Sequence, residues 1–248
     1  MKKVIVLSAI VFLFSTKGLS QDNNRKGFTA VNLGISIPTG NFRSDYFENN
    51  ESGYATTGLI MDFTCGYKIR ENIGLIAIYR SQANGVDVGA YAQDLANYFG
   101  TGNPAGTTSV TVESNVYSLG GIMAGTYGAF PIADKLSFEP RILIGFSAAT
   151  LPAMTTETYY RSTLLTTFIR EQPATWTFSY NIGTGAKLEL SEKICLTLNL
   201  DFYAARAEWD NVQEVGIGHM SNTTEIYQFE YRQKFSTFNV STGLGFRF

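Results

Sequence analysis

The chain is poor in the residues that build most metal sites and enzymatic sites. Its 248 residues include one His and two Cys, and only 16% of them are charged. One imidazole and two thiols do not supply the four ligands of the usual structural zinc site. A formal net charge of −2 provides no basic stripe for nucleic acid. No phosphate-binding glycine loop and no dinucleotide fingerprint occurs, so we expect no cofactor.

The chain also lacks a long apolar run. Its longest, residues 4–14, follows two lysines and precedes small residues at positions 18 and 20. It has only about half of the roughly 20 residues that a spanning helix needs. The pattern instead predicts a signal peptide over residues 1–20 and a mature domain over residues 21–248.

What the sequence does contain is alternation. In the last eleven residues, 238–248, every second side chain is apolar or a threonine, and those between are polar or glycine. Because side chains point to alternate faces of a strand, this predicts a strand with one apolar face. Seven further segments fit the same description, at about 28–38, 55–67, 73–83, 116–130, 136–146, 175–190 and 194–203. In the fourth of them, we expect the outward side chains to be Tyr117, Leu119, Met123 and Tyr127.

The connections between these segments alternate in length. Short links lie near residues 69, 133 and 192, and long ones cover about 39–54, 84–112, 149–173 and 207–224. Membrane barrels place short turns on the periplasmic side and long loops outside. The sequence therefore predicts an all-β fold, an eight-stranded antiparallel up-and-down transmembrane barrel with both termini in the periplasm. Ten strands remain an alternative if residues 156–169 form another hairpin, and a soluble β-sandwich is a second alternative.

Two further features carry a resemblance. The final aromatic residue, Phe248, with Phe246 before it, resembles the signal read by the barrel-insertion machinery, and residues 34–42 are similar to a recurrent end of the first strand in small barrels. The chain thus resembles the small outer-membrane barrels of the OmpA, OmpX and OmpW kind, in a style common in Bacteroidota. The resemblance implies an outer-membrane location, with outer-membrane lipid, lipopolysaccharide and the insertion machinery as partners. Members act variously as adhesins, small channels, assembly factors or structural proteins, so it leaves the role open.

The lumen of an eight-stranded barrel is just wide enough for side chains to fill. We expect charges of both signs to point into it and to pair, because an unpaired buried charge is costly. The predicted polar network of the lumen comprises Asp62, Arg80, Glu139, Arg141, Lys187, Glu189, Asp201 and Arg247. Paired charges would plug the barrel, whereas a continuous polar path would make it a narrow channel. Strand parity places Cys65 on the lipid face and Cys195 on the lumen face, so we expect no disulfide.

The long loops hold the candidates for recognition, because loops on a rigid scaffold commonly carry binding residues. Residues 86–99 are predicted to form a short amphipathic helix on the rim. The candidate contact residues for an extracellular protein or glycan are Tyr91, Tyr98, Phe99, Tyr159, Tyr160 and Arg161. The alternative interpretation is that these rings pack against the mouth of the barrel.

His219 and Ser221 form the strongest enzymatic pattern. A histidine beside a hydroxyl can act as a general base if a carboxylate orients the ring. The segment His-Met-Ser-Asn resembles a motif of the outer-membrane lipid A deacylases, but the glutamate pattern expected after it is missing, and Glu225 and Glu230 are merely available acids. We therefore expect a non-enzymatic barrel with a structural or recognition role through its extracellular loops. A narrow channel for small or hydrophobic solutes and a deacylase-like hydrolase are the alternatives.

Overall fold

The computed structural model describes residues 26–49, 51–100 and 108–248, so the expected signal peptide lies outside the described residues. Eight long strands pair in sequence order around a closed ring, every pair antiparallel. They are β1 (Gly27–Pro38), β2 (Gly58–Arg70), β3 (Ile73–Asn84), β5 (Tyr117–Gly128), β8 (Arg141–Thr150), β11 (Ala174–Glu189), β12 (Ile194–Gly218) and β13 (Thr223–Arg247).

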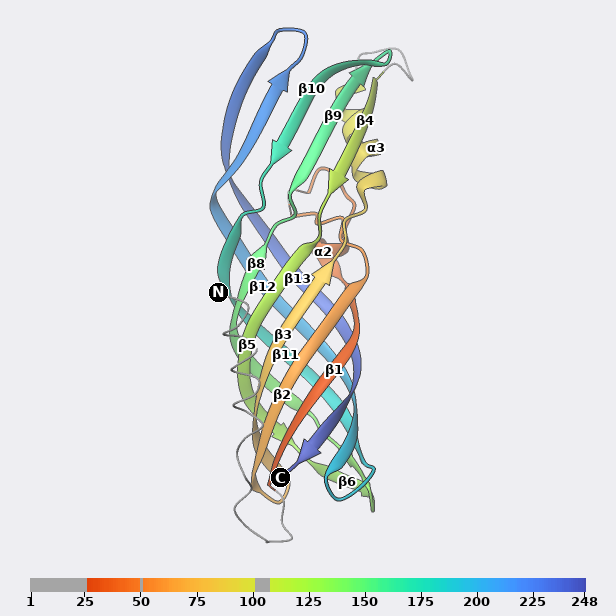
Figure 1. The fold of residues 1–248 in the computed structure, drawn as a ribbon, viewed down its shortest axis with the longest axis vertical. Coiled ribbons are helices and arrows are strands. Elements are labelled where there is room, and N and C mark those ends of the chain that lie inside the picture. The colour runs from red at the N-terminus through yellow and green to blue at the C-terminus, as the bar shows by residue number, and fades with distance from the viewer. Residues whose placement is uncertain (1–25, 50, 101–107) are drawn as a thin grey trace, which may run out of the picture.

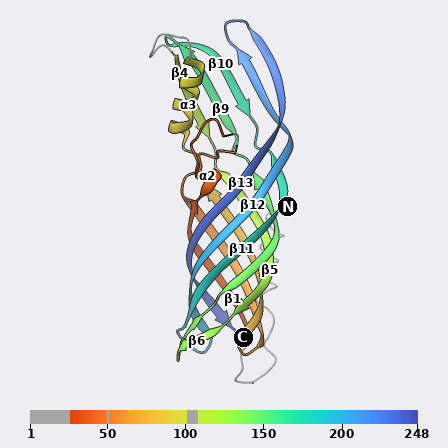
Figure 2. The same cartoon turned by 180° about the vertical axis from the view of Figure 1, so that it is seen from behind.

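The first and last strands close the ring. β1 pairs with β13 from Phe28 opposite Arg247 to Pro38 opposite Thr237, and the tilted strands are visible in Figures 1 and 2. Closure pairs both edges of each strand through the barrel wall, which is what a sheet requires in hydrocarbon. The prediction of an eight-stranded up-and-down barrel is confirmed.

The two faces of the wall differ as the alternation predicts. Outward side chains are large and apolar: Leu59 is 71% exposed and Trp176 is 72% exposed. Their inward neighbours are polar and buried, as for Asn32 at 2% and Asp62 at 1%. An apolar surface that encircles a closed polar interior is the arrangement of a barrel that stands in lipid.

The fourth predicted strand was assigned the wrong orientation. Tyr117, Leu119, Met123 and Tyr127 all point inward and are at most 4% exposed, whereas Ile122 faces outward. Their side chains, together with Ile78 and Leu143 on the neighbouring strands, belong to an apolar cluster inside the barrel. Both faces of this strand carry apolar residues, so the alternation pattern did not reveal which face contacts lipid.

Two predicted loops are sheet instead. Residues 207–224 continue β12 and begin β13, so that these strands run as a hairpin well beyond the barrel, as Figure 1 shows. The hairpin suspected at 156–169 exists as β9 (Met154–Tyr160) and β10 (Thr163–Arg170), but it lies outside the ring. With β4 (Thr108–Ser114) these strands form a sheet in the order β4-β9-β10-β12-β13, which we call the outer sheet. The ten-stranded alternative is therefore wrong.

The remaining elements lie at the two ends of the barrel. α2 (Gly40–Arg43) and α3 (Val88–Gly100) are at the end that carries the outer sheet, and β6 (Phe130–Ala133) and β7 (Leu136–Phe138) form a small hairpin at the end near the C-terminus. The helix expected at 86–99 is confirmed, and the Asp87 carboxylate accepts a hydrogen bond from the Ala90 amide at its start. Within the described ranges, no helix is long and apolar enough to cross a membrane.

Candidate functional site

The middle of the lumen is crossed by a cluster of two arginines and two aspartates, which we call the ionic tier. The Arg80 guanidinium grips both Asp62 oxygens, at 2.9 and 2.8 Å, and reaches Asp201 at 3.1 Å. Arg141 donates to both Asp201 oxygens, at 2.9 and 2.5 Å. Each of these four side chains is at most 6% exposed. Bidentate contacts between neutralising charges are the arrangement in which buried ions are least costly.

Amides complete the ionic tier. Asn181 accepts a hydrogen bond from Arg80 at 2.8 Å and donates one to Asp201 at 3.0 Å, while Asn199 accepts from Arg141 at 2.9 Å. The participants come from β2, β3, β8, β11 and β12, on opposite sides of the ring. The tier therefore joins facing walls of the barrel across its whole width.

A glycine makes the central contact possible. Gly183 on β11 is the register partner of Arg141 on one side and of Asp201 on the other. A Cβ at this position would lie 1.9 Å from the Asp201 Oδ1 atom. Because Gly183 has no side chain, Arg141 reaches across β11 to Asp201.

Aromatic rings pack together inside the lumen at the end that carries the outer sheet, and we call them the aromatic tier. Phe42 of α2 is fully buried, and its ring centroid lies 4.9 Å from that of Phe235 and 5.1 Å from that of Tyr117, both in edge-on geometry. Trp209 packs on Phe235 at 6.3 Å. The Tyr117 hydroxyl donates to the Gly53 carbonyl at 3.0 Å, which ties the segment after α2 into the mouth.

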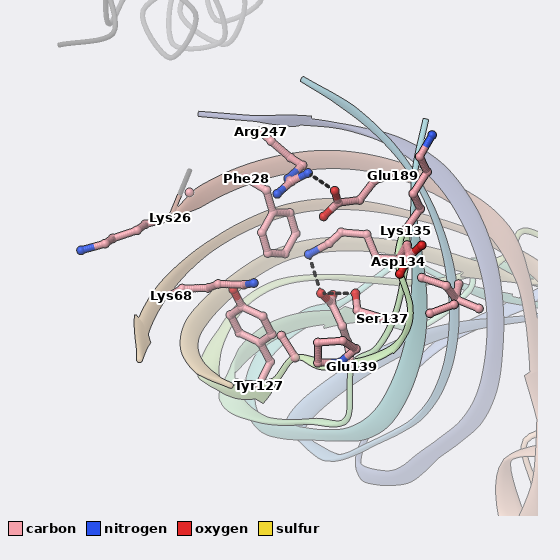
Figure 3. Close-up of a pocket in the computed structure, with 16 residues that line it drawn as sticks. Lys26, Phe28, Lys68, Tyr127, Asp134, Lys135, Ser137, Glu139, Glu189 and Arg247 are labelled. Atoms are coloured by element: carbon pink, nitrogen blue, oxygen red, sulfur yellow. Dashed lines mark hydrogen bonds and ion pairs between the residues drawn. The ribbon is translucent and has the colours of Figure 1, made fainter. Parts of the chain in front are cut away.

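The opposite mouth, near the C-terminus, holds the other predicted lumen charges. Lys187 pairs with Glu139 at 2.5 Å and lies 3.7 Å from the centre of the Phe28 ring. Arg247 pairs with Glu189 at 2.6 Å. Figure 3 shows these groups around a small cavity. The structure thus brings all eight predicted lumen residues into ion pairs, in two separate groups.

The outer sheet continues beyond the aromatic tier, and one of its faces is rich in aromatic rings. On this face Tyr231 lies between Trp209, 6.1 Å away, and the Arg170 guanidinium, 5.9 Å from its ring centre. Glu214 is the register partner of Arg170, and burial raises the pKa of its carboxyl group. Tyr91 of α3 approaches the rim of this face, where it packs on Tyr54 at 5.1 Å.

The candidate recognition residues do not form one surface. Tyr98 stacks between Phe47 and Phe99, each 5.5 Å away, at the end of α3. Tyr159 donates to Glu157 at 2.6 Å. Tyr160 and Arg161 stack on each other at 5.4 Å in the β9–β10 turn. The candidates are thus divided between α3 and the tip of the outer sheet.

Loop residues also anchor α3. Tyr54 donates to Asp94 at 2.9 Å, and burial, followed by this hydrogen bond, raises the pKa of the Tyr54 hydroxyl.

His219 and Ser221 do not contact each other. Both lie in the turn at the tip of the β12–β13 hairpin, where His219 Nε2 lies 2.9 Å from Thr167 Oγ1 and Ser221 Oγ lies 2.7 Å from Thr223 Oγ1. The nearby acids are engaged elsewhere, since Glu225 accepts from Tyr227 and Glu230 lies 3.7 Å from Arg232. In the part of the chain that the structure describes, no three His, Cys, Asp or Glu side chains gather as a metal site would require.

The remaining predicted positions lie on the barrel wall. Phe246 and Phe248 project outward at the end of β13, 47% and 55% exposed. Cys65 is exposed and Cys195 is buried, as strand parity predicts, and both are free thiols.

Sequence reasoning missed the aromatic tier and the outer sheet. Phe42 was not a distinctive signal, because the same loop also contains Tyr46, Phe47 and Tyr54. Along β13, alternation of Tyr227, Phe229 and Tyr231 with polar residues continues the strand pattern toward its N-terminal end. In β12 the register shifts between Trp209 and Val212, and this bulge hides the alternation.

A closed eight-stranded ring with an apolar exterior and a buried, charge-paired interior defines a small integral β-barrel of the outer-membrane class. No protein-family model matches the chain, and no curated protein matches it. Among solved structures, it is similar to the attachment invasion locus protein Ail of Yersinia pestis (10% identity, 90% of this chain and 99% of that chain, TM-score 0.40) and to a major outer membrane protein of Thermus thermophilus (11%, 90% and 99%, 0.49). It is also similar to the N-terminal β-barrel domain of Pseudomonas aeruginosa OprF (10%, 90% and 98%, 0.37). With likeness this distant, the class rests on the ring and its two faces.

Proposed function

We propose that this protein is a closed membrane scaffold that presents the outer sheet for recognition at the cell surface. The observation that carries the proposal is the free edge of β13. Residues 223–235 of β13 pair with β12 on one side. On the other side, the Thr39 amide bonds the Ser236 carbonyl, and β1 joins β13 from Thr237 onward. No strand among the described residues covers the other edge. Exposed backbone N–H and C=O groups along such an edge can pair with an extended segment of another protein.

The side chains along this edge suit an extended partner. Tyr227, Phe229 and Tyr231 share one face, and Gln228, Glu230 and Arg232 share the other. An added strand with alternating apolar and polar residues would match both faces, as in known cases of strand addition. The opposite edge of the outer sheet, β4, lies against α3.

The closed lumen is the second part of the proposal. The ionic tier has no net charge, and the aromatic tier above it contains no charged group, so neither offers an ion a continuous polar path. Both support a plug over a channel. Planar-bilayer recordings with the purified protein are expected to give no steady conductance, and a stable open-channel current would contradict this part.

The remaining assignments follow from this arrangement. The short turns near the C-terminus would face the periplasm together with both chain termini, and the outer sheet would face the exterior. The apolar exterior would contact outer-membrane lipid and lipopolysaccharide, and Phe246 and Phe248 would be read by the insertion machinery. The separation of His219 from a carboxylate supports a non-enzymatic role. Lipid A from cells with and without the protein should therefore give identical mass spectra.

The recognition role is tested by removing the outer hairpin. Trp209 and Tyr231 are direct cross-strand partners, so a two-residue Asn-Gly turn can join them in place of residues 210–230. A phage-displayed peptide library is panned on the full-length protein in nanodiscs and counter-selected on this shortened variant. We expect peptides of alternating apolar and polar residues that bind only the full-length protein.

The shortened variant must still show the heat-modifiable electrophoretic mobility of a folded barrel. If that barrel binds the selected peptides equally well, or if no peptide is enriched, the edge of β13 is not the recognition element.

A further inference from the structure

The mouth near the C-terminus contains a cavity of about 110 Å³ beneath the Lys187–Glu139 pair. Two of the polar groups that line it have no partner among the described residues. The Tyr127 side chain is buried, and its hydroxyl makes no hydrogen bond. The Lys68 side chain makes no ion pair or hydrogen bond within the described ranges, and Figure 3 shows it extending toward Tyr127. A buried hydroxyl without a partner is uncommon and requires an explanation.

The fold brings these two groups together through a glycine. Lys68 on β2 and Tyr127 on β5 are both register partners of Gly74 on β3, the strand between them. A Cβ at Gly74 would lie 2.4 Å from the Tyr127 ring, so the bare position makes room for it. The ionic tier uses the same device at Gly183. In both places two inward side chains from the flanking strands share a glycine as their register partner, but only Arg141 and Asp201 are bonded to each other.

The charges around the cavity favour an anion. The charge of Lys187 is neutralised by its ion pair with Glu139, and that of Arg247 by its ion pair with Glu189. Three further lysines, Lys26, Lys68 and Lys135, then line the cavity with a single carboxylate, Asp134. The surplus is positive. Lys68 lies near the end of β2, whereas Lys26, Asp134 and Lys135 lie outside the strands.

We propose that this cavity binds a small oxyanion, a phosphate or a carboxylate group, between Lys68, Lys187 and the Tyr127 hydroxyl. Each of these groups donates hydrogen bonds, and an ammonium group carries three N–H bonds, so Lys187 can hold Glu139 and a ligand together. Oxyanion oxygens accept from all three and form charge-assisted bonds, which are stronger than neutral ones. Water would also satisfy Tyr127, but an oxyanion would in addition pair with the ammonium group of Lys68. The site is independent of the role proposed for the outer sheet.

The test is an NMR titration of the full-length protein in zwitterionic detergent with inorganic phosphate at constant ionic strength. Saturable shifts are expected at the amides of Phe28, Lys68, Gly74 and Tyr127. Lys68→Gln should weaken phosphate binding by about five- to tenfold, since it removes one charge-assisted contact. Tyr127→Phe should weaken it by about threefold, since it removes one neutral donor. Lys193→Gln, which changes an exposed lysine in the nearby β11–β12 turn, is the matched control and should leave the affinity unchanged.

Two further arms identify the source of the oxyanion. Acetate tests the carboxylate, and nanodiscs with phosphatidylglycerol in place of phosphatidylcholine test a lipid headgroup. Saturation by any of these ligands with loss in Lys68→Gln supports the site and names its ligand. The proposal is overturned if none of them saturates the shifts, or if Lys68→Gln and Lys193→Gln weaken binding equally. Unchanged spectra away from the mouth establish that both variants are folded.

Discussion

The strands β12 and β13 each have an inner half in the barrel wall and an outer half that extends beyond it. The two halves differ in how their edges are paired and in which side chains face outward. In the barrel, residues 194–205 and 237–247 have a paired strand on both sides, and outward positions such as Leu196 and Leu198 are apolar. Beyond the barrel, residues 223–235 of β13 have one paired edge, and outward positions such as Arg206 and Lys234 are charged. Because the same strands continue through both regions, the difference comes from the surroundings, which determine whether a strand edge can remain unpaired. Hydrocarbon forbids an unpaired edge, whereas water tolerates one.

Proline should reveal this difference most strongly. In the inner half, the N–H of Val240 has a strand on either side, Ile35 of β1 and Leu200 of β12 being its register partners. Val240→Pro therefore removes a ladder bond in the membrane and should abolish barrel assembly. In the outer half, Ile226 has a partner only in β12, and Ile226→Pro should leave assembly intact. Assembly is measured as the heat-modifiable electrophoretic mobility of each variant in outer-membrane fractions. Equal assembly of the two variants would contradict the proposed difference between the two halves.

The ionic tier should dominate the stability of the inner half. Asp201→Asn leaves Arg80 and Arg141 without the carboxylate they share, and stranding buried charge costs about 3–5 kcal/mol. The unfolding free energy in urea with lipid vesicles should fall by that amount. Asp210→Asn, which changes an exposed residue in the β12 bulge, is the control and should have little effect. A loss for Asp201→Asn no larger than for Asp210→Asn would show that the tier contributes nothing.

The aromatic tier lies between the barrel and the outer sheet, and its disruption should destabilise only the segments that pack on it. Phe42→Ala empties a fully buried site, for which about 3 kcal/mol is a typical cost. Amide exchange should accelerate across residues 40–55, while the ring strands stay protected. Phe47→Ala changes a half-buried ring that, among the described residues, stacks on Tyr98 alone, and it should leave Gly53 protected. If amide exchange accelerated equally in all segments of both variants, Phe42 would not be specifically required to hold residues 40–55 in place.

The smallest effect concerns a salt bridge at the boundary between the regions. A hydrogen bond from Lys234, 2.7 Å away, is the main reason why the pKa of Glu51 is lowered from its usual 4.5. A lowered pKa stabilises the fold above the unfolded-state pKa, and this contribution disappears as the pH falls through the folded-state pKa. At about half exposure for Lys234, it is worth at most about 1 kcal/mol. In the native protein, the exchange protection of the Gly53 amide should decrease when the pH is lowered below 4.5. In Glu51→Gln, the protection should not depend on pH. A native protein whose protection is also independent of pH would contradict this prediction.

The barrel could be predicted from the sequence because lipid favours apolar side chains at the outward positions, which are every second residue of a strand. The alternation in β11, β12 and β13 therefore reveals both the strands and their faces. Where the interior is also apolar, as around Met123, the same signal becomes ambiguous and the orientation was assigned wrongly. Beyond the membrane this preference ends, and a single bulge after Trp209 was enough to make a strand look like a loop.

The site was less predictable than the fold. Parity along a strand indicates that a charge points inward, but it does not say which partner it meets. Arg80 and Asp201 are 121 positions apart, and only closure of the ring brings them together. The contribution of Gly183 and Gly74 is also invisible in sequence, because each matters only through its two neighbours across the sheet.

The register of the ionic tier has a consequence for the order in which the barrel matures. Asp62 and Arg80 face each other on consecutive strands, so a nascent β2–β3 hairpin already holds a neutral pair that can enter the bilayer. Arg141 and Asp201 belong to the later half of the chain, on β8 and β12, and they meet across Gly183 of the intervening β11. The bond between Arg80 and Asp201 joins the two halves, and it forms only once the wall has curved round on itself. An intact contact between Arg80 and Asp201 is therefore expected only in the closed barrel.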